Sequence, residues 1–178
     1  MDIDTLLHDD AARVAAFPIV ERQDFFGHAG VAPLPAVAID AIRRFADESR
    51  RQMQESPWAI EQVKLARRHA AELIAADQRE IALLGPTSLG LNLVAHGLDW
   101  QDGDEVIYYA DDYPANVYCW MELANRGVRP LPIGTDDHLD GELGAITWRR
   151  LEPLLTERTR LGSLATCNFI SGYRIDYA

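Results

Sequence analysis

Two hydroxyl residues, Thr87 and Ser88, stand where a helix is expected to begin. They follow residues 80–84, which are apolar after Glu80 and which we interpret as a strand, and a short Gly-Pro turn. The first backbone N–H groups of a helix have no partner within it and lie at the positive end of its dipole, so they attract phosphate groups. The N–H groups of Leu89 and Gly90 would complete such a site. An ordinary N-capped helix would show the same local pattern.

A tyrosine, Tyr113, precedes Pro114 at the expected start of another helix. The proline restricts the backbone at this point, which would hold the aromatic ring in a defined position. Stacking on a flat ligand is one use of such a ring. The alternative is a tyrosine that is merely packed on the surface. Together with Thr87 and Ser88, this tyrosine suggests a site for a phosphorylated ligand that carries a planar ring.

The spacing and order of four blocks resemble those of the class V aminotransferase family of pyridoxal-phosphate enzymes. This family also contains cysteine desulfurases, kynureninases and isopenicillin N epimerase-like proteins. The resemblance implies an α/β fold, the three-layer large domain of the aspartate-aminotransferase type with a mainly parallel sheet, incomplete at its C-terminal side. It also implies pyridoxal 5′-phosphate as cofactor, a small amino acid as substrate and a homodimer. The four blocks are residues 84–95, 103–107, 112–116 and 167–176.

On this resemblance, the cofactor is held by residues from three of the blocks. Thr87, Ser88 and Leu89 would bind the cofactor phosphate, and the ring of Tyr113 would lie on the pyridine face. Phe169 occupies the position at which desulfurases have an asparagine. An apolar contact would therefore replace a hydrogen bond to the cofactor.

The substrate side of the site is expected in an N-terminal turn. His28 and Ala29 resemble a turn of small residues that lies near the substrate carboxylate in many family members. An asparagine usually precedes the histidine, and Gly27 stands there in this chain. The other histidines have no companions at metal-ligand spacing, so no metal site is expected. We interpret Cys119 and Cys167 as buried thiols, and neither matches the desulfurase nucleophile.

The family's chemistry requires a Schiff-base lysine, and the only lysine of this chain is Lys64. Lys64 lies far upstream of the phosphate site, whereas the family's lysine and its cofactor-binding aspartate lie beyond residue 178. We therefore expect an N-terminal part of such an enzyme, with no catalytic residue of its own and no transaminase activity. The alternative is a non-catalytic or split-subunit protein that keeps the binding or dimerising surface and is completed by a C-terminal half. A nucleotide-binding domain is a weaker possibility, since the Gly-rich motifs of such domains are missing.

The composition limits the partners of the chain. A formal net charge of −11 argues against binding to nucleic acid or to an anionic membrane, because both would repel it. No apolar run is long enough to cross a bilayer, and the acidic N-terminus is unlike a secretory signal. A cytoplasmic location is the resulting expectation.

The apolar periodicity predicts helices that alternate with strands, which favours a parallel sheet. Residues 1–34 are expected to form an N-terminal arm and the substrate-side turn, and residues 35–178 a partial cofactor-binding domain. Residues 134–144 are acidic and Gly-rich and are expected to form a loop. The predicted helices are 36–54, 57–76, 88–97, 113–126 and 147–155, and the predicted strands are 80–84, 104–109, 129–133 and 160–167.

Overall fold

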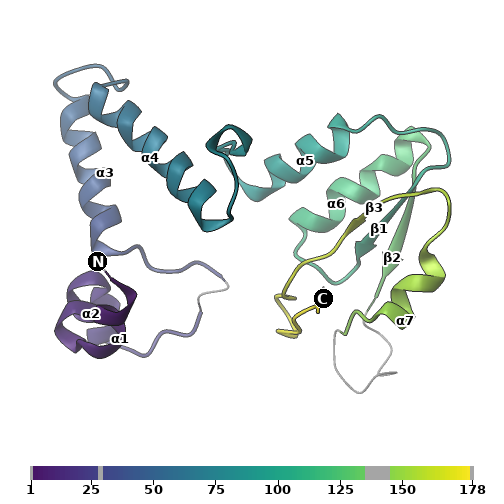
Figure 1. Ribbon diagram of the computed structural model, residues 1–178, viewed down its shortest axis with the longest axis horizontal. Helices are drawn as coiled ribbons and strands as arrows, with labels where there is room; N and C mark the ends of the chain where they lie inside the picture. The colour runs from purple at the N-terminus through teal and green to yellow at the C-terminus, as the bar shows by residue number, and fades with distance from the viewer. Residues whose placement is uncertain (1, 28–29, 135–144, 177–178) are drawn as a thin grey trace. The chain divides into compact units, whose positions relative to one another are not determined.

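The computed structural model describes residues 2–27, 30–134 and 145–176 and divides into two compact units, Met1–Leu83 and Leu84–Ala178 (Figure 1). This boundary differs from the division into residues 1–34 and 35–178 expected from the sequence, and that division stays a prediction. The predicted loop at 134–144 lies almost wholly outside the described residues.

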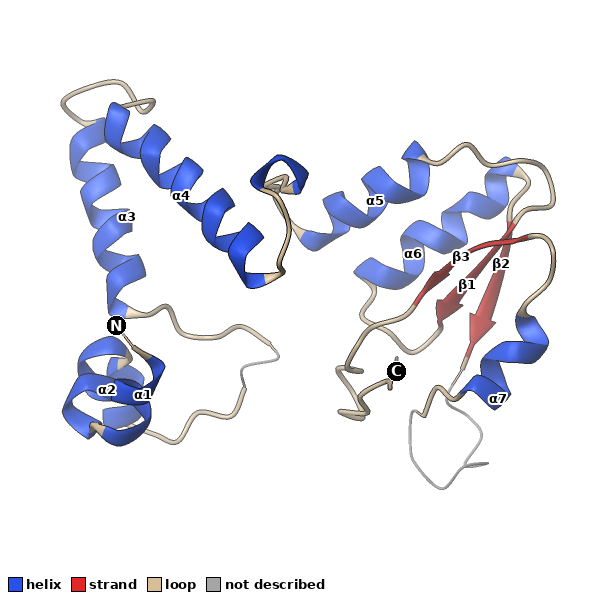
Figure 2. Ribbon diagram, in the orientation of Figure 1, coloured by secondary structure: helices blue, strands red, loops and turns tan. Residues whose placement is uncertain are grey.

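The first unit is built from helices and short turns (Figure 2). The first turns of three helices are capped by side chains: Asp2, Asp9 and Ser56 each accept a hydrogen bond from a backbone N–H group. Within the described ranges of the whole chain, no helix is both long enough and apolar enough to cross a lipid bilayer. The elements of this unit are α1 (Ile3–His8), α2 (Asp10–Ala16), η1 (Pro18–Glu21), α3 (Ala36–Ser49), α4 (Pro57–Leu73) and η2 (Gln78–Glu80).

The predicted strand at residues 80–84 is wrong. Its first residue belongs to η2, where Asp77 and Glu80 form a reciprocal capping box, and residues 81–84 have no regular structure. A strand needs a neighbour to satisfy its backbone groups. Among the described residues, none pairs with this segment.

The second unit is an α/β structure around a parallel three-stranded sheet in the order β2-β1-β3. The central strand pairs in parallel with both neighbours, so that Ile107 faces Leu131 on one side and Gly162 on the other. The expected α/β fold with a parallel sheet is confirmed. The elements are α5 (Thr87–Gly97), β1 (Glu105–Tyr109), α6 (Ala115–Met121), η3 (Glu122–Arg126), β2 (Arg129–Ile133), α7 (Trp148–Leu151), η5 (Glu152–Leu154) and β3 (Thr159–Ser163).

Both faces of the sheet are covered, which makes this unit three-layered. All five residues of β1 are buried, and the four from Val106 to Tyr109 alternate between two apolar clusters because successive side chains of a strand point to opposite faces. On one face, Val106 and Tyr108 pack with α5 and α6; on the other, Ile107 and Tyr109 pack with α7 and η5 (Figure 2). The core residue Trp120 of α6 is 1% exposed.

The amino ends of the three strands are tied together by one buried carboxylate. Glu105 of β1 accepts hydrogen bonds from Arg129 Nη1 of β2 at 2.9 Å and from Thr156 Oγ1, just before β3, at 2.6 Å. Both oxygens of this 3% exposed residue are thereby satisfied. The loops that carry the candidate site lie at the opposite, carboxyl end of the sheet.

We expect Gly127→Ala to lower the free energy of unfolding by about 1–2 kcal/mol. Gly127 ends η3 with φ of +80°, and an added Cβ would clash with the Asp102 carboxylate. Gly97→Ala is the matched control, because a Cβ at this position meets no atom within 4 Å. It should leave stability unchanged or raise it by up to about 1 kcal/mol. Urea unfolding of both variants tests this, and equal losses would contradict the argument.

Candidate functional site

The predicted cofactor residues gather at the carboxyl end of the parallel strands. The loops after β1 and β3 leave the sheet at this end, and they carry Tyr113 and Phe169. Helix α5 packs along α6, and its C-terminus leads to the amino end of β1. The first turn of α5 therefore lies toward the carboxyl end of the sheet (Figure 1). In open α/β sheets, ligands bind in the crevice at this end of the strands.

The start of α5 differs from the expected arrangement. Pro86 is the N-cap and no side chain caps the helix, so Thr87 and Ser88 are its first two residues and not its caps. The Leu89 N–H group donates to the Pro86 carbonyl at 2.9 Å. Within the described residues, the N–H groups of Thr87 and Ser88 have no hydrogen-bond acceptor. The anion-attracting groups of this helix are therefore those of Thr87 and Ser88.

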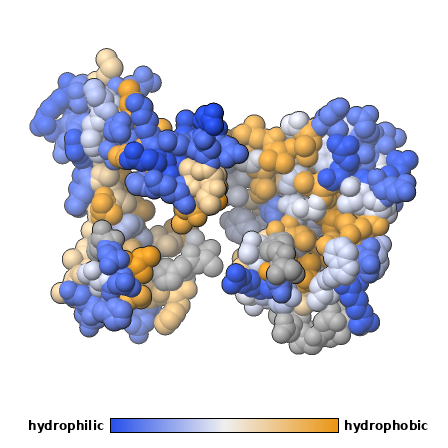
Figure 3. All heavy atoms as spheres, viewed as in Figure 1, coloured by the Kyte–Doolittle hydropathy of each residue, from blue (hydrophilic) through white to orange (hydrophobic). Residues whose placement is uncertain are grey.

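Apolar side chains remain exposed along α5. Leu89, Leu93 and Val94 are 45%, 54% and 49% exposed, and apolar residues lie in the region of α5 in the space-filling view (Figure 3). Asn92 Nδ2 of the same helix donates to the Ser88 carbonyl at 2.7 Å. This bond braces the first turn of the helix.

The backbone at Tyr113 is held by a buried carboxylate. Asp112 is 8% exposed, and its two oxygens accept hydrogen bonds from the Tyr113 N–H and from Asn116 Nδ2, both at 2.7 Å. Asn116 Oδ1 in turn accepts from Trp120 Nε1 at 3.0 Å and from Ser163 Oγ of β3 at 2.6 Å. The Tyr113 ring itself is 61% exposed. A fixed backbone thus carries an accessible aromatic ring.

Phe169 lies against Tyr113. The two ring centroids are 5.5 Å apart and the ring planes meet at 79°, which is the edge-to-face geometry that aromatic pairs favour. The structure therefore brings together two of the predicted cofactor residues that are far apart in the sequence. The predicted substrate-side residues His28 and Ala29 lie outside the described residues.

The two cysteines lie in different surroundings. Cys119 is buried in the α6 core, where burial raises the pKa of its thiol above the usual value. Cys167 was expected to be buried but is exposed, and its thiol donates to the Gly172 carbonyl at 3.4 Å. The described part of the chain contains no group of three or more His, Cys, Asp or Glu that could hold a metal ion.

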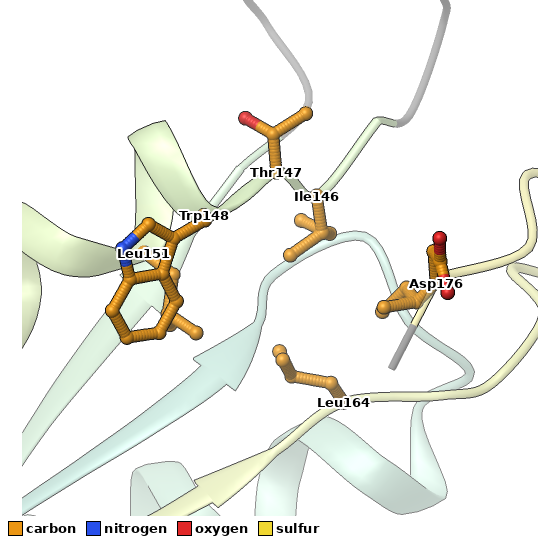
Figure 4. Close-up of a pocket in the computed structure, with 7 residues that line it drawn as sticks. Ile146, Thr147, Trp148, Leu151, Leu164 and Asp176 are labelled. Carbon is orange, nitrogen blue, oxygen red and sulfur yellow. The ribbon is translucent and has the colours of Figure 1, made fainter. Parts of the chain in front are cut away.

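A separate hollow of about 350 Å³ opens beside α7 (Figure 4). Its walls are mostly apolar, and they contain none of the predicted cofactor residues. Its lining consists of Ile146, Thr147, Trp148, Leu151, Leu164, Ile175 and Asp176.

Comparison with known proteins identifies one family. The sequence model of the family Aminotransferase class-V matches residues 25–178. A probable cysteine desulfurase of Methanothermobacter thermautotrophicus is 26% identical over 149 residues, which are 81% of this chain and 36% of that protein. An uncharacterized aminotransferase of Schizosaccharomyces pombe is 24% identical and is matched over 90% of this chain and 41% of its own length. The chain thus spans about two fifths of the length of these relatives.

Solved structures share the fold. The cystine C-S lyase C-DES, in complex with its reaction product cysteine persulfide, has a TM-score of 0.76 at 22% identity, covering 89% of this chain and 42% of that one. Another C-DES structure carries glycine covalently linked to the PLP cofactor, with a TM-score of 0.74. The cysteine desulfurase CsdA of Escherichia coli has a TM-score of 0.73 at 24% identity and covers 93% of this chain and 43% of its own.

Proposed function

Because the chain belongs to the class V aminotransferase family, we propose that it forms part of a pyridoxal-phosphate-dependent enzyme that acts on an amino acid. In this proposal, the carboxyl end of the sheet in the second unit holds the cofactor. The phosphate is bound by the first turn of α5, and one face of the cofactor ring is covered by Tyr113. The observation that carries the proposal is the uncapped start of α5 at the same end of the sheet as the Tyr113–Phe169 pair.

The geometry of α5 fits a phosphate group. Two backbone N–H groups that have no acceptor among the described residues lie at the positive end of an 11-residue helix. The hydroxyl groups of Thr87 and Ser88 lie on the same turn and make no hydrogen bond to the described residues, so both are available as further donors. Leu89 contributes its N–H only if the bond to the Pro86 carbonyl is exchanged, which makes it the weakest of the three predicted ligands.

The aromatic pair fits a planar ring. The Tyr113 ring is largely exposed, and Phe169, itself 48% exposed, supports its edge. Tyr113 would fix the tilt of the cofactor ring by stacking. Bound pyridoxal phosphate supplies an electron sink for bond cleavage at the α-carbon of an amino acid, and the protein's part is to orient it and to exclude water.

The single lysine of the chain lies outside the unit that carries the proposed cofactor site. Lys64 lies on α4 in the first unit, is 69% exposed and pairs with Glu61 at 3.9 Å. We propose that the covalent lysine is not among these 178 residues and that they have no transaminase activity alone. A complementing C-terminal half would supply this lysine, and the complete protein would be a homodimer in the cytoplasm. The second candidate function is that of a non-catalytic protein with the same binding surface, and it too rests on the position of Lys64.

We expect the protein expressed from its native gene to bind pyridoxine 5′-phosphate at least about 100-fold more tightly than pyridoxine, because two charge-assisted hydrogen bonds contribute about 1.5 kcal/mol or more each. Neither compound has an aldehyde, so no lysine is needed and the ratio reports the phosphate alone. Isothermal titration measures it. Equal affinities would contradict the proposal, and tighter binding of ADP would favour a nucleotide site instead.

A further inference from the structure

The side chain of Asn168 joins the two loops that carry the aromatic pair. Asn168 is 3% exposed, and its Nδ2 donates to the Asp111 carbonyl, 57 residues away in sequence, at 3.0 Å. Asp111 belongs to the loop of Tyr113, whereas Asn168 directly precedes Phe169. One buried amide thus connects the segments beneath both rings.

The other end of the same amide shapes its own loop. Asn168 Oδ1 accepts hydrogen bonds from the N–H groups of Ile170 and Ser171, both at 2.9 Å, and from Ser171 Oγ at 3.2 Å. The backbone of Asn168 closes the loop as well, since its N–H donates to the Tyr173 carbonyl at 2.9 Å and its carbonyl accepts from the Gly172 N–H at 2.9 Å. Several hydrogen bonds therefore close the loop around Phe169, and the Nδ2 bond is the one by which this side chain ties it to the loop of Tyr113.

We propose that Asn168 is the positioning residue that sets the contact between Phe169 and Tyr113, and with it the tilt of the ring face offered to the cofactor. The second part rests on the proposed function. An amide is required because it donates to a carbonyl and accepts from N–H groups at the same time. A carboxylate could still accept the three bonds within the loop, but it could not donate to Asp111.

Asn168→Asp therefore removes the tie between the loops and keeps the acceptor for the loop itself. Ser171→Ala is the matched control. It removes the Ser171 Oγ bond to the same oxygen and the bond that Ser171 Oγ accepts from the Tyr173 N–H, and it leaves the tie intact. Both variants are made in the protein expressed from its native gene. The first readout needs no cofactor: at 5.5 Å, each ring shifts the proton resonances of the other, and NMR detects this shift.

We expect Asn168→Asp to abolish the ring-induced shifts and to weaken binding of pyridoxine 5′-phosphate about fivefold, whereas Ser171→Ala should change neither. In a Tyr113→Leu background, Asn168→Asp should have no further effect on binding, which separates positioning from a general loss of structure. Unchanged ring shifts in Asn168→Asp, or equal losses in Ser171→Ala, would overturn the proposal.

Two further outcomes are decisive. If the wild-type protein binds no pyridoxine 5′-phosphate, the proposed function fails, and the ring shifts still decide the role of Asn168. If the Asn168→Asp variant does not fold, the proposal is tested on the wild-type protein instead, by measuring hydrogen exchange of the Asn168 Nδ2 protons. Slow exchange supports the buried bond to Asp111, and exchange as fast as that of an exposed amide overturns the proposal.

Discussion

Replacing Trp120 by alanine is expected to lower the free energy of unfolding by about 3–5 kcal/mol, the range for large aromatic residues in a core. Trp120 is 1% exposed and packs against the buried residues of β1 and α6. Its Nε1 also donates to Asn116 Oδ1, which links α6 to Ser163 of β3. The substitution therefore leaves a cavity and also loosens the network below Tyr113.

Two controls identify the origin of this loss in urea unfolding. Trp120→Phe keeps much of the packing but loses the Nε1 bond, and it should be considerably less destabilising than alanine. Tyr118→Ala changes an aromatic residue on the same helix that is 67% exposed, and it should stay within about 0.5 kcal/mol of the wild type. A loss in Tyr118→Ala as large as that in Trp120→Ala would show that the described core is wrong.

Ser88→Glu is expected to weaken binding of pyridoxine 5′-phosphate by at least about 30-fold. Ser88 is the second residue of α5, where the phosphate is proposed to bind. A carboxylate placed about 5 Å from a phosphate charge costs roughly 3 kcal/mol at an effective dielectric constant of 20, before screening by salt. The same carboxylate lies at the positive end of the helix dipole, so it should stabilise the helix by about 0.3–1 kcal/mol.

Ser88→Gln matches glutamate in size but carries no charge, so it separates repulsion from crowding. It should weaken binding far less than Ser88→Glu, and the difference between the two should shrink as salt is added. Titration and urea unfolding are measured on both variants. Equal losses of affinity, or a Ser88→Glu protein that binds normally, would place the phosphate elsewhere.

Local patterns predicted most elements of the second unit. The strand at 129–133 was predicted with its observed bounds, and α5 begins one residue before its predicted start. The predicted helix 113–126 is split, because Asn116 leaves helical geometry and the last turn becomes η3 before Gly127. The segment 80–84 failed because a strand depends on a partner, which composition alone cannot provide.

The sequence indicated the individual residues of the candidate site, but not which of them contact each other in space. Type and spacing indicated Thr87, Ser88 and Tyr113, whereas the edge-to-face contact with Phe169 depends on two loops far apart in the sequence. The role of Asp112 was not predicted, because acidic residues in loops are usually solvated, whereas this one is buried and bonded to Tyr113 and Asn116. A helix-capping pattern would not have identified it, because no side chain caps α6 and Asp112 accepts from the adjacent Tyr113 N–H.

The most direct test of the proposed cofactor site is to follow the backbone amide resonances of Thr87 and Ser88 by NMR as pyridoxine 5′-phosphate is added, with pyridoxine as the control. We predict that both resonances shift with the phosphorylated compound, that pyridoxine leaves them largely in place, and that the Tyr113 ring signals move with the same affinity. Unmoved Thr87 and Ser88 resonances, with shifts confined to the hollow at Trp148, would contradict the account.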